Sequence, residues 1–152
     1  DYKARLALPL EIIRAVREEV GPDFVVGMRL SQGMVTDSRL KWDGGLEAAR
    51  YRIATLAAAG LDYIHVTEAD ISAPAFEEGE SLAAIAKGAV EIPIIGNGAI
   101  GTGDQAQQLL DAGVLDFVAI GKAALANHED RPSCQLCREP ANESNTVIPN
   151  PR

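Results

Sequence analysis

A glycine-rich segment, residues 91–127, constrains the fold of this chain more than any other part of its sequence. The segment opens with Ile92–Ile95, a short apolar run rich in β-branched residues that predicts a strand buried on both faces. Glycines follow at positions 96, 98, 101 and 103. A second apolar run, Asp116–Ile120, predicts another buried strand and leads directly into Gly121 and Lys122. The pattern indicates two parallel strands that each end in glycine and are each followed by a helix.

The residues between the two runs have the signals of a helix and of an anion site. Thr102 and Gln105 have the spacing of a capping box, so a helix is predicted to start near Gly103 and to stop at Gly113. Glycine leaves backbone N–H groups uncovered, and the N-terminus of a helix lies beside them. Because Lys122 adds a positive charge at the same end, the ligand that the segment favours is a phosphate.

The earlier part of the chain has the same strand-then-helix order. Apolar residues at helical spacing predict a leading helix that stops at Gly21-Pro22. Strands are predicted at Phe24–Leu30 and Asp62–Thr67, with helices at Leu46–Gly60 and between Ser81 and Gly88. Four strands that start near residues 24, 62, 92 and 116 and alternate with helices predict a parallel α/β sheet.

Two architectures fit such a sheet, a closed barrel and an open doubly wound sheet. A Rossmann dinucleotide site is disfavoured, because GNGAIG lacks the context of a first βα turn followed by an acidic residue about 20 positions later. Phosphate binding by the glycine ends of the last two strands is the pattern of a (β/α)8 barrel.

Arg29 is the side chain of the first strand with the clearest functional interpretation. Strand alternation places Arg29 on one face with Val25 and Gly27. It could simply reach solvent from the end of a buried strand. We favour a cation held over a ligand, because Gly27 clears space on the same face.

Other polar residues are predicted to be structural. Trp42, in the long connection that follows the first strand, packs on its own loop or contacts substrate, and it is not chosen as a site residue. His65 is predicted to be a hydrogen-bonded core residue, with support of a nearby site as the lesser alternative. Residues 68–80 are interpreted as a solvated, flexible acidic loop rather than a metal or acid–base site. The charged face of the leading helix is predicted to be solvated with weak pairing and comprises Arg14, Arg17, Glu18 and Glu19.

Composition excludes several classes of partner. The chain has 152 residues, 47% of them hydrophobic, which fits one globular domain. A net charge of -8 and a pI of about 4.7 disfavour binding to nucleic acid or to an anionic membrane. No apolar run approaches the roughly 20 residues that span a bilayer. Two cysteines give no disulfide framework, and no signal peptide is visible, so the expected location is the cytoplasm.

Four segments taken together resemble one family. They occur in series between about Ala4 and Asn127, and they are VGMRLS (26–31), LAAAGLDYIHVTE (56–68), IPIIGNGAIGT (92–102) and LDFVAIGKAALAN (115–127). This series is similar to the old yellow enzyme family of FMN-dependent NAD(P)H:flavin oxidoreductases. The resemblance implies that the strands are the fifth to eighth of a (β/α)8 TIM barrel, that is, its C-terminal half within residues 1–127.

The resemblance also implies cofactors, a substrate class and binding residues. Arg29 would contact the pyrimidine side of the flavin, and the amides of Gly98 and Ala99 would hold the FMN phosphate together with Gly121 and Lys122. NAD(P)H would be the reductant and a small activated alkene the substrate. Where the family usually has arginine this chain has Lys122, which keeps the charge but loses a bidentate contact.

The resemblance assigns no catalytic residue in this chain. The family's substrate-anchoring histidine pair (or histidine and asparagine) and its tyrosine proton donor belong to the first half of the barrel. Neither His65 nor His128 is assigned to those roles.

The segment after the barrel, residues 128–152, is predicted to be an irregular or disordered tail. It contains Cys134 and Cys137, and some multidomain relatives carry an iron–sulfur cluster at this place. Such a cluster needs four thiolates and the chain has two cysteines, so no metal site is predicted.

A half barrel has two open edges and one uncovered sheet face. We therefore expect the chain to be part of a longer enzyme, completed by a missing N-terminal half, or to pair with a second copy. Two other functions stay open: a non-redox phosphate-binding barrel enzyme, such as a sugar-phosphate isomerase or lyase, and a truncated product without activity.

Overall fold

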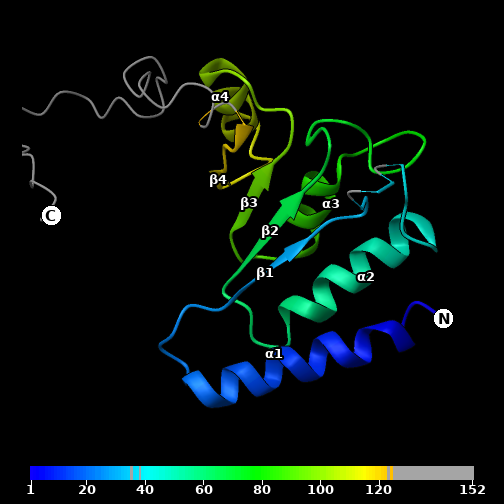
Figure 1. The fold of residues 1–152 in the computed structure, drawn as a ribbon, viewed down its shortest axis with the longest axis vertical. Helices are drawn as coiled ribbons and strands as arrows, with labels where there is room; N and C mark the ends of the chain where they lie inside the picture. The colour runs from blue at the N-terminus through cyan, green and yellow to red at the C-terminus, as the bar shows by residue number, and fades with distance from the viewer. Residues whose placement is uncertain (35, 38, 123, 125–152) are drawn as a thin grey trace, which may run out of the picture.

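The computed structural model describes residues 1–34, 36–37, 39–122 and 124. These residues form one parallel sheet with helices between its strands, as predicted (Figure 1). In chain order the elements are η1 (Ala4–Leu6), α1 (Ala7–Val20), β1 (Gly27–Leu30), α2 (Gly45–Ala57), β2 (Tyr63–Thr67), α3 (Leu82–Ala89), β3 (Ile94–Asn97), α4 (Gly103–Asp111) and β4 (Phe117–Val118). The predictions for His128, Cys134, Cys137 and the tail at 128–152 lie outside the described residues.

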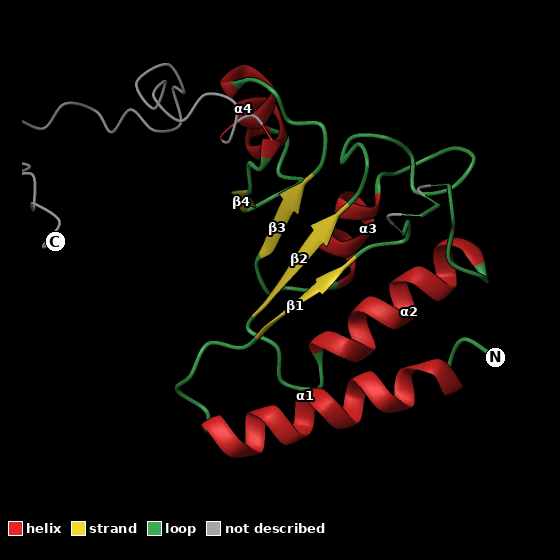
Figure 2. Ribbon diagram, viewed as in Figure 1, coloured by secondary structure: helices red, strands yellow, loops and turns green. Residues whose placement is uncertain are grey.

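The order of the strands decides between the two predicted architectures. The sheet order is β1-β2-β3-β4, the same as the order along the chain. A doubly wound sheet needs a point at which the strand order reverses, and the described strands contain no such point. Right-handed crossovers in one direction place the connecting helices on one face of the sheet, and Figure 2 shows α2 and α3 on the same side of it. The arrangement is that of part of a barrel wall.

The two faces of the sheet have opposite character. On the helix side, Ile64, Val66 and Ile94 are fully buried and form the centre of the hydrophobic core. On the other side, which we call the inner face, one register row crosses the whole sheet and consists of Arg29, His65, Ile95 and Phe117. The predicted alternation of side chains is therefore confirmed, but the inner face is only partly covered.

The predicted strand ends and strand burial need correction. β1 begins at Gly27 rather than Phe24, and Phe24 and Val25 are 62% and 67% exposed. No residue of β1 is fully buried, since nothing among the described residues covers its outer edge. β4 has two residues instead of the predicted five at 116–120, and Phe117 is 58% exposed.

The predicted helix ends are close to those observed, because local capping fixes them. The capping box of Thr102 and Gln105 is complete, with each side chain bonded to the other residue's backbone N–H. The Ser81 hydroxyl accepts from the Ala84 amide at 3.2 Å and starts α3, which ends one residue later than predicted. Gly21 ends α1 with a φ of 78°.

The same pair of hydrogen bonds from an aspartate to the neighbouring strand occurs twice in the sheet. Asp62 donates its amide to the Val26 carbonyl at 2.7 Å, and its carboxylate accepts from the Val26 amide at 2.7 Å. Asp116 makes the same two bonds to Ile94, at 2.9 and 2.8 Å. Both follow a leucine and precede an aromatic residue. Each aspartate thus fixes the register of its strand against the neighbouring strand.

Each of these aspartates is also paired with a cation from a helix. Asp116 contacts the Lys87 ammonium at 2.7 Å, and Asp62 contacts the Arg17 guanidinium at 2.5 Å. The pKa of Asp62 is lowered first by the hydrogen bond from the Val26 amide and then by Arg17. The pKa of Asp116 is lowered first by the hydrogen bond from Lys87 and then by the one from the Ile94 amide. Because both pKa values are lowered in the folded chain, the ionised aspartates stabilise the fold at pH values above the ordinary carboxyl pKa. This stabilisation is lost as the pH falls through the pKa values of the folded chain.

The helical position of Arg17 predicted a solvated side chain with weak pairing, and this prediction is wrong. Its side chain is 20% exposed and donates to the carbonyls of Gly60, Gly21 and Phe24 as well as to Asp62. The guanidinium therefore joins the end of α1 to the segments that lead into β1 and β2.

Candidate functional site

The structure brings all five predicted cofactor-binding residues to the carboxyl end of the sheet. Arg29 lies in β1, Gly98 and Ala99 follow β3 directly, and Gly121 and Lys122 follow β4. Since the strands are parallel, all their carboxyl ends lie on the same side of the sheet. The carboxyl edge of a parallel sheet is where α/β proteins bind ligands.

The turn after β3 has two successive residues with positive φ and two amides without a described hydrogen-bond partner. Gly98 has a φ of 148° and Ala99 a φ of 52°, the left-handed region that non-glycine residues rarely adopt. In the described part of the chain, neither amide donates a hydrogen bond, whereas the Gly98 carbonyl accepts from the Ile71 amide at 3.2 Å. The two N–H groups are therefore available to an anion.

The segment after β4 is hydrogen-bonded to the end of β3. The Asn97 side-chain amide donates to the Ala119 carbonyl at 3.1 Å, and the Ala119 amide donates to the Gly96 carbonyl at 2.8 Å. No described atom lies within 4 Å of the place where a Cβ on Gly121 would stand, and Lys122 is exposed. This end of the sheet is therefore open and carries a positive charge.

A small cleft adjoins the turn after β3 on the side of α4. Its volume is about 320 Å³. Its walls are Asp70, Ser72, Gly98, Ala99, Ile100, Gln105, Gln108 and Leu109. Because the Asp70 carboxylate lies in this wall, the cleft is less suited to an anion than the side of the turn that faces Gly121 and Lys122.

Arg29 is oriented by its neighbour in β2. Its Nε donates to the Thr67 hydroxyl at 2.9 Å, and the guanidinium is otherwise exposed on the inner face. The interpretation of Gly27 was wrong, because a Cβ there would lie 2.1 Å from the Tyr63 ring. Gly27 makes room for Tyr63 and not for a ligand.

His65 lies between Arg29 and Ile95 in the inner row. Its Nε2 is buried and has no hydrogen-bond partner among the described residues, so the prediction of a hydrogen-bonded core histidine is wrong for that atom. Burial first, and the Arg29 charge second, lower the pKa of His65 below its ordinary value of 6.5. The imidazole is therefore neutral at pH 7 and adds no charge beside Arg29.

We expect His65 to titrate below pH 6.5 in the folded chain. An NMR titration of the two histidine ring signals, assigned with a His65→Gln variant, measures its midpoint. An Arg29→Gln change should raise that midpoint without fully restoring the ordinary value, because burial acts in the same direction. The unfolded state takes up the proton first, so stability should fall as the pH falls from 6.5 through the folded pKa. A midpoint at or above 6.5 would contradict this environment.

Gln32 was missed by the sequence analysis. It is 2% exposed, and neither polar atom of its carboxamide has a hydrogen-bond partner in the described structure. Its backbone amide donates to the Glu68 carboxylate at 2.8 Å. A glutamine two residues after a predicted strand could have drawn notice, but its burial depends on how two distant loops pack.

The acidic loop at residues 68–80 is not simply solvated. Ile71 and Ala75 are 1% and 3% exposed, and both belong to the core cluster. Glu80 pairs with Arg50 of α2 at 3.1 Å. In the described chain no group of three or more histidine, cysteine or acidic residues could hold a metal ion.

Trp42 packs on the structure rather than on a ligand site. The buried Arg52 side chain of α2 lies between two rings, 4.8 Å from the Tyr2 centroid and 5.5 Å from the Trp42 centroid. The same guanidinium bonds to the Asp43 carbonyl at 2.8 Å and to its carboxylate. The loop before α2 is therefore tied to that helix.

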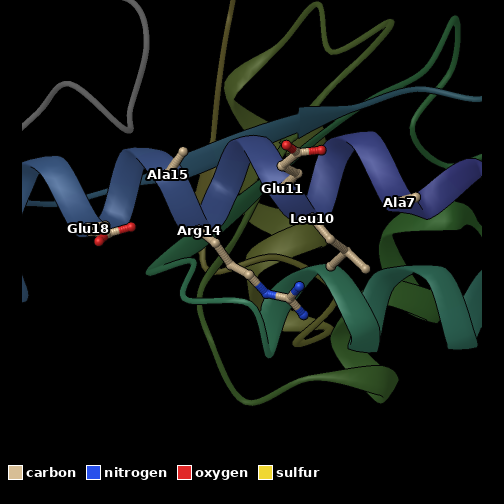
Figure 3. Close-up of a pocket in the computed structure, with 6 residues that line it drawn as sticks. All are labelled: Ala7, Leu10, Glu11, Arg14, Ala15 and Glu18. Carbon is tan, nitrogen blue, oxygen red and sulfur yellow. The ribbon is translucent and has the colours of Figure 1, made fainter.

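Two larger hollows of the described surface lie away from this site. One, of about 490 Å³, lies along α1 and is lined by Ala7, Leu10, Glu11, Arg14, Ala15 and Glu18 (Figure 3). The charged side chains there belong to one helix face, without a glycine turn or an unpaired amide. We assign no ligand to it.

No described helix has the length and apolar character needed to cross a bilayer.

Comparison with known proteins identifies relatives over almost the whole described chain. The sequence profile of the NADH:flavin oxidoreductase / NADH oxidase family matches residues 1–130. An NADH oxidase of Thermoanaerobacter brockii is 31% identical over 138 residues, which are 85% of this chain and 21% of that protein. An N,N-dimethylglycine/sarcosine dehydrogenase of Chromohalobacter salexigens is 33% identical, over 84% of this chain and 20% of its own length.

Solved structures match in the same way. Morphinone reductase in complex with tetrahydroNAD superposes with a TM-score of 0.67 at 26% identity. The match covers 94% of this chain and 38% of that one. The chain thus corresponds to part of the barrel and spans about a fifth of the length of these curated relatives.

Proposed function

Because the chain belongs to the NADH:flavin oxidoreductase / NADH oxidase family, we propose that it carries the FMN half-site of an NAD(P)H-dependent oxidoreductase. Its strands would be the fifth to eighth of the barrel, within residues 1–127, and residues 128–152 would follow as an irregular tail. The substrate class would be small activated alkenes, as in the ene-reductases of the old yellow enzyme type.

The observation that carries the proposal is the pair of strand ends whose glycine amides have no hydrogen-bond partner among the described residues. The N–H groups of Gly98, Ala99 and Gly121 would hold the phosphate, and Lys122 would neutralise its charge. Arg29, oriented by Thr67, would lie against the pyrimidine side of the flavin ring. When bound, FMN supplies the hydride-transfer chemistry that the side chains of this sheet lack.

The chain's own residues have binding and orienting roles in this proposal. The neutral His65 leaves Arg29 as the charge of the inner row, which favours an electron-rich ring above it. No proton donor is assigned among the described residues. Family membership and Arg29 favour this redox function over a non-redox phosphate-binding barrel.

Titration of the chain with FMN, followed by flavin absorbance, tests the half-site. We expect saturable binding, and Lys122→Ala should weaken it about tenfold because one charge-assisted phosphate contact is lost. Riboflavin is the matched control ligand, since it has the same ring without the phosphate. Its affinity should be unchanged by Lys122→Ala and reduced by Arg29→Gln.

Two results would count against the proposal. The first is the absence of saturable FMN binding. The second is an equal loss of FMN and riboflavin affinity in Lys122→Ala, which would mean that the lysine does not act through the phosphate.

A further inference from the structure

The carboxyl end of β2 lies between two parts of the candidate site. On one side, β1 carries Arg29, and we call Arg29 and the segment that follows β1 the ring end. On the other side, Gly98 and Ala99 follow β3, and we call this turn the phosphate end. Figure 2 shows the carboxyl ends of the three strands next to one another. Glu68, the first residue after β2, contacts both ends.

On the side of β1, the side chain of Glu68 holds the segment that follows the strand. The ladder between β1 and β2 stops at the pair of Leu30 and Val66. Beyond it, the Glu68 carboxylate accepts a hydrogen bond from the Gln32 amide at 2.8 Å. Gln32 is 2% exposed, so without the carboxylate this buried N–H would lose its described partner. The carboxylate therefore fixes the backbone just after the strand that carries Arg29.

On the side of β3, the backbone of Glu68 packs against the glycine turn. Its amide donates to the Asn97 carbonyl at 3.1 Å. Its carbonyl oxygen lies where a Cβ on Gly98 would stand, so the two backbones approach more closely than any other residue at position 98 would allow. The Ile71 amide then donates to the Gly98 carbonyl at 3.2 Å. The phosphate end is thus held by the main chain at and after Glu68.

We propose that Glu68 is a positioning residue that fixes the ring end of the site relative to its phosphate end. Its backbone belongs to the phosphate side, and its carboxylate holds the segment after β1. A ligand with a ring at one end and a phosphate at the other then finds both contacts already at the right spacing. The inference rests on the proposed function for the identity of that ligand.

A direct contact of the Glu68 carboxylate with the ligand is disfavoured by its charge. A carboxylate repels a phosphate and an electron-rich ring. Its described partner is a backbone amide of this chain, so it acts through the position of the loop. All these contacts join residues of this chain, and the inference therefore does not require that any other polypeptide cover the sheet.

Hydrogen exchange of the Gln32 amide, followed by NMR, tests the link without any ligand. Glu68→Ala removes the acceptor, so we expect this exchange to become at least about tenfold faster. Glu68→Gln keeps a side-chain oxygen that can accept the same bond, and the exchange should stay slow. Glu78→Ala is the matched control, because Glu78 lies in the same loop, is exposed and makes no ion pair with a described residue. It should leave the exchange unchanged.

Titrations of the same variants with FMN and with riboflavin test the spacing. Glu68→Ala should weaken FMN binding about three- to tenfold, and riboflavin binding by less. Riboflavin has no phosphate, so it uses the ring end alone and gains less from a fixed spacing. Glu68→Gln should restore the affinity for FMN. A loss of folded structure would instead lower both affinities to the same extent, and circular dichroism of each variant reports it separately.

Two results would overturn the inference. One is exchange of the Gln32 amide that is no faster in Glu68→Ala than in Glu78→Ala. The other is a folded Glu68→Ala chain whose affinities for FMN and riboflavin fall equally or not at all. If the unsubstituted chain bound neither ligand, the proposed function would fail and the role in flavin binding with it. The exchange measurement would still decide whether Glu68 holds Gln32.

Discussion

Replacing Gly98 with alanine is expected to destabilise the chain by about 2–4 kcal/mol. The new Cβ would lie 2.2 Å from the Glu68 carbonyl oxygen and 3.0 Å from the Ile71 amide nitrogen. Both are backbone atoms, so no side-chain rotation relieves the contact. The φ of 148° adds strain for any residue with a Cβ. Urea unfolding followed by circular dichroism measures the loss.

Gly121→Ala is the matched control for this change. A Cβ at Gly121 meets no described atom within 4 Å, and its backbone needs no positive φ. We expect its free energy of unfolding to stay within about 0.5 kcal/mol of the unsubstituted chain. Its FMN affinity should fall, because the methyl group would enter the proposed phosphate site. Equal stability of the two variants would mean that the turn after β3 does not pack on the loop after β2 as described.

The elements that could be predicted are those specified by nearby residues. The capping box of Thr102 and Gln105, the Ser81 cap and the Gly21 stop are short-range signals, and each is found where the sequence placed it. The parallel sheet followed from the alternation of apolar runs with helices. The position of the glycine turn after β3 could be predicted because it needs only a local backbone conformation, and its role as an anion site stays a prediction.

Features that depend on distant segments were missed or misjudged. Gly27 accommodates the ring of Tyr63, 36 positions away in the chain, and no local signal shows this. Gln32 is buried because the loops after β1 and β2 pack together through Glu68. The strand predicted at 24–30 is too long, because Phe24 and Val25 are exposed residues that precede β1. Hydrophobicity alone does not distinguish them from residues of the strand.

The repeated Leu-Asp-aromatic pattern before β2 and at β4 could have been found by comparing segments within the sequence. Leu61-Asp62-Tyr63 and Leu115-Asp116-Phe117 have the same pattern and make the same pair of bonds to the neighbouring strand. The partner cations could not be predicted this way, because Lys87 comes from the helix between two strands and Arg17 from the leading helix.

Arg17→Ala is expected to cost about 2–3 kcal/mol of stability, the other large effect of a single substitution. Its guanidinium donates to Gly60 at 3.0 and 2.7 Å, to Gly21 at 3.0 Å and to Phe24 at 2.6 Å, besides the ion pair with Asp62. These carbonyls lie in the two connections that lead into β1 and β2, and the loss of one side chain removes partners from both.

Arg14→Ala is the control for the lost charge. Arg14 lies on the same helix, its side chain points toward α2 in Figure 3, and it makes no ion pair with a described residue. We expect that change to alter stability by less than about 0.5 kcal/mol. Denaturant unfolding of both variants separates the two roles. If Arg17→Ala were no more destabilising than Arg14→Ala, the guanidinium would not be what joins α1 to the sheet, and the solvated face predicted from helical spacing would be correct.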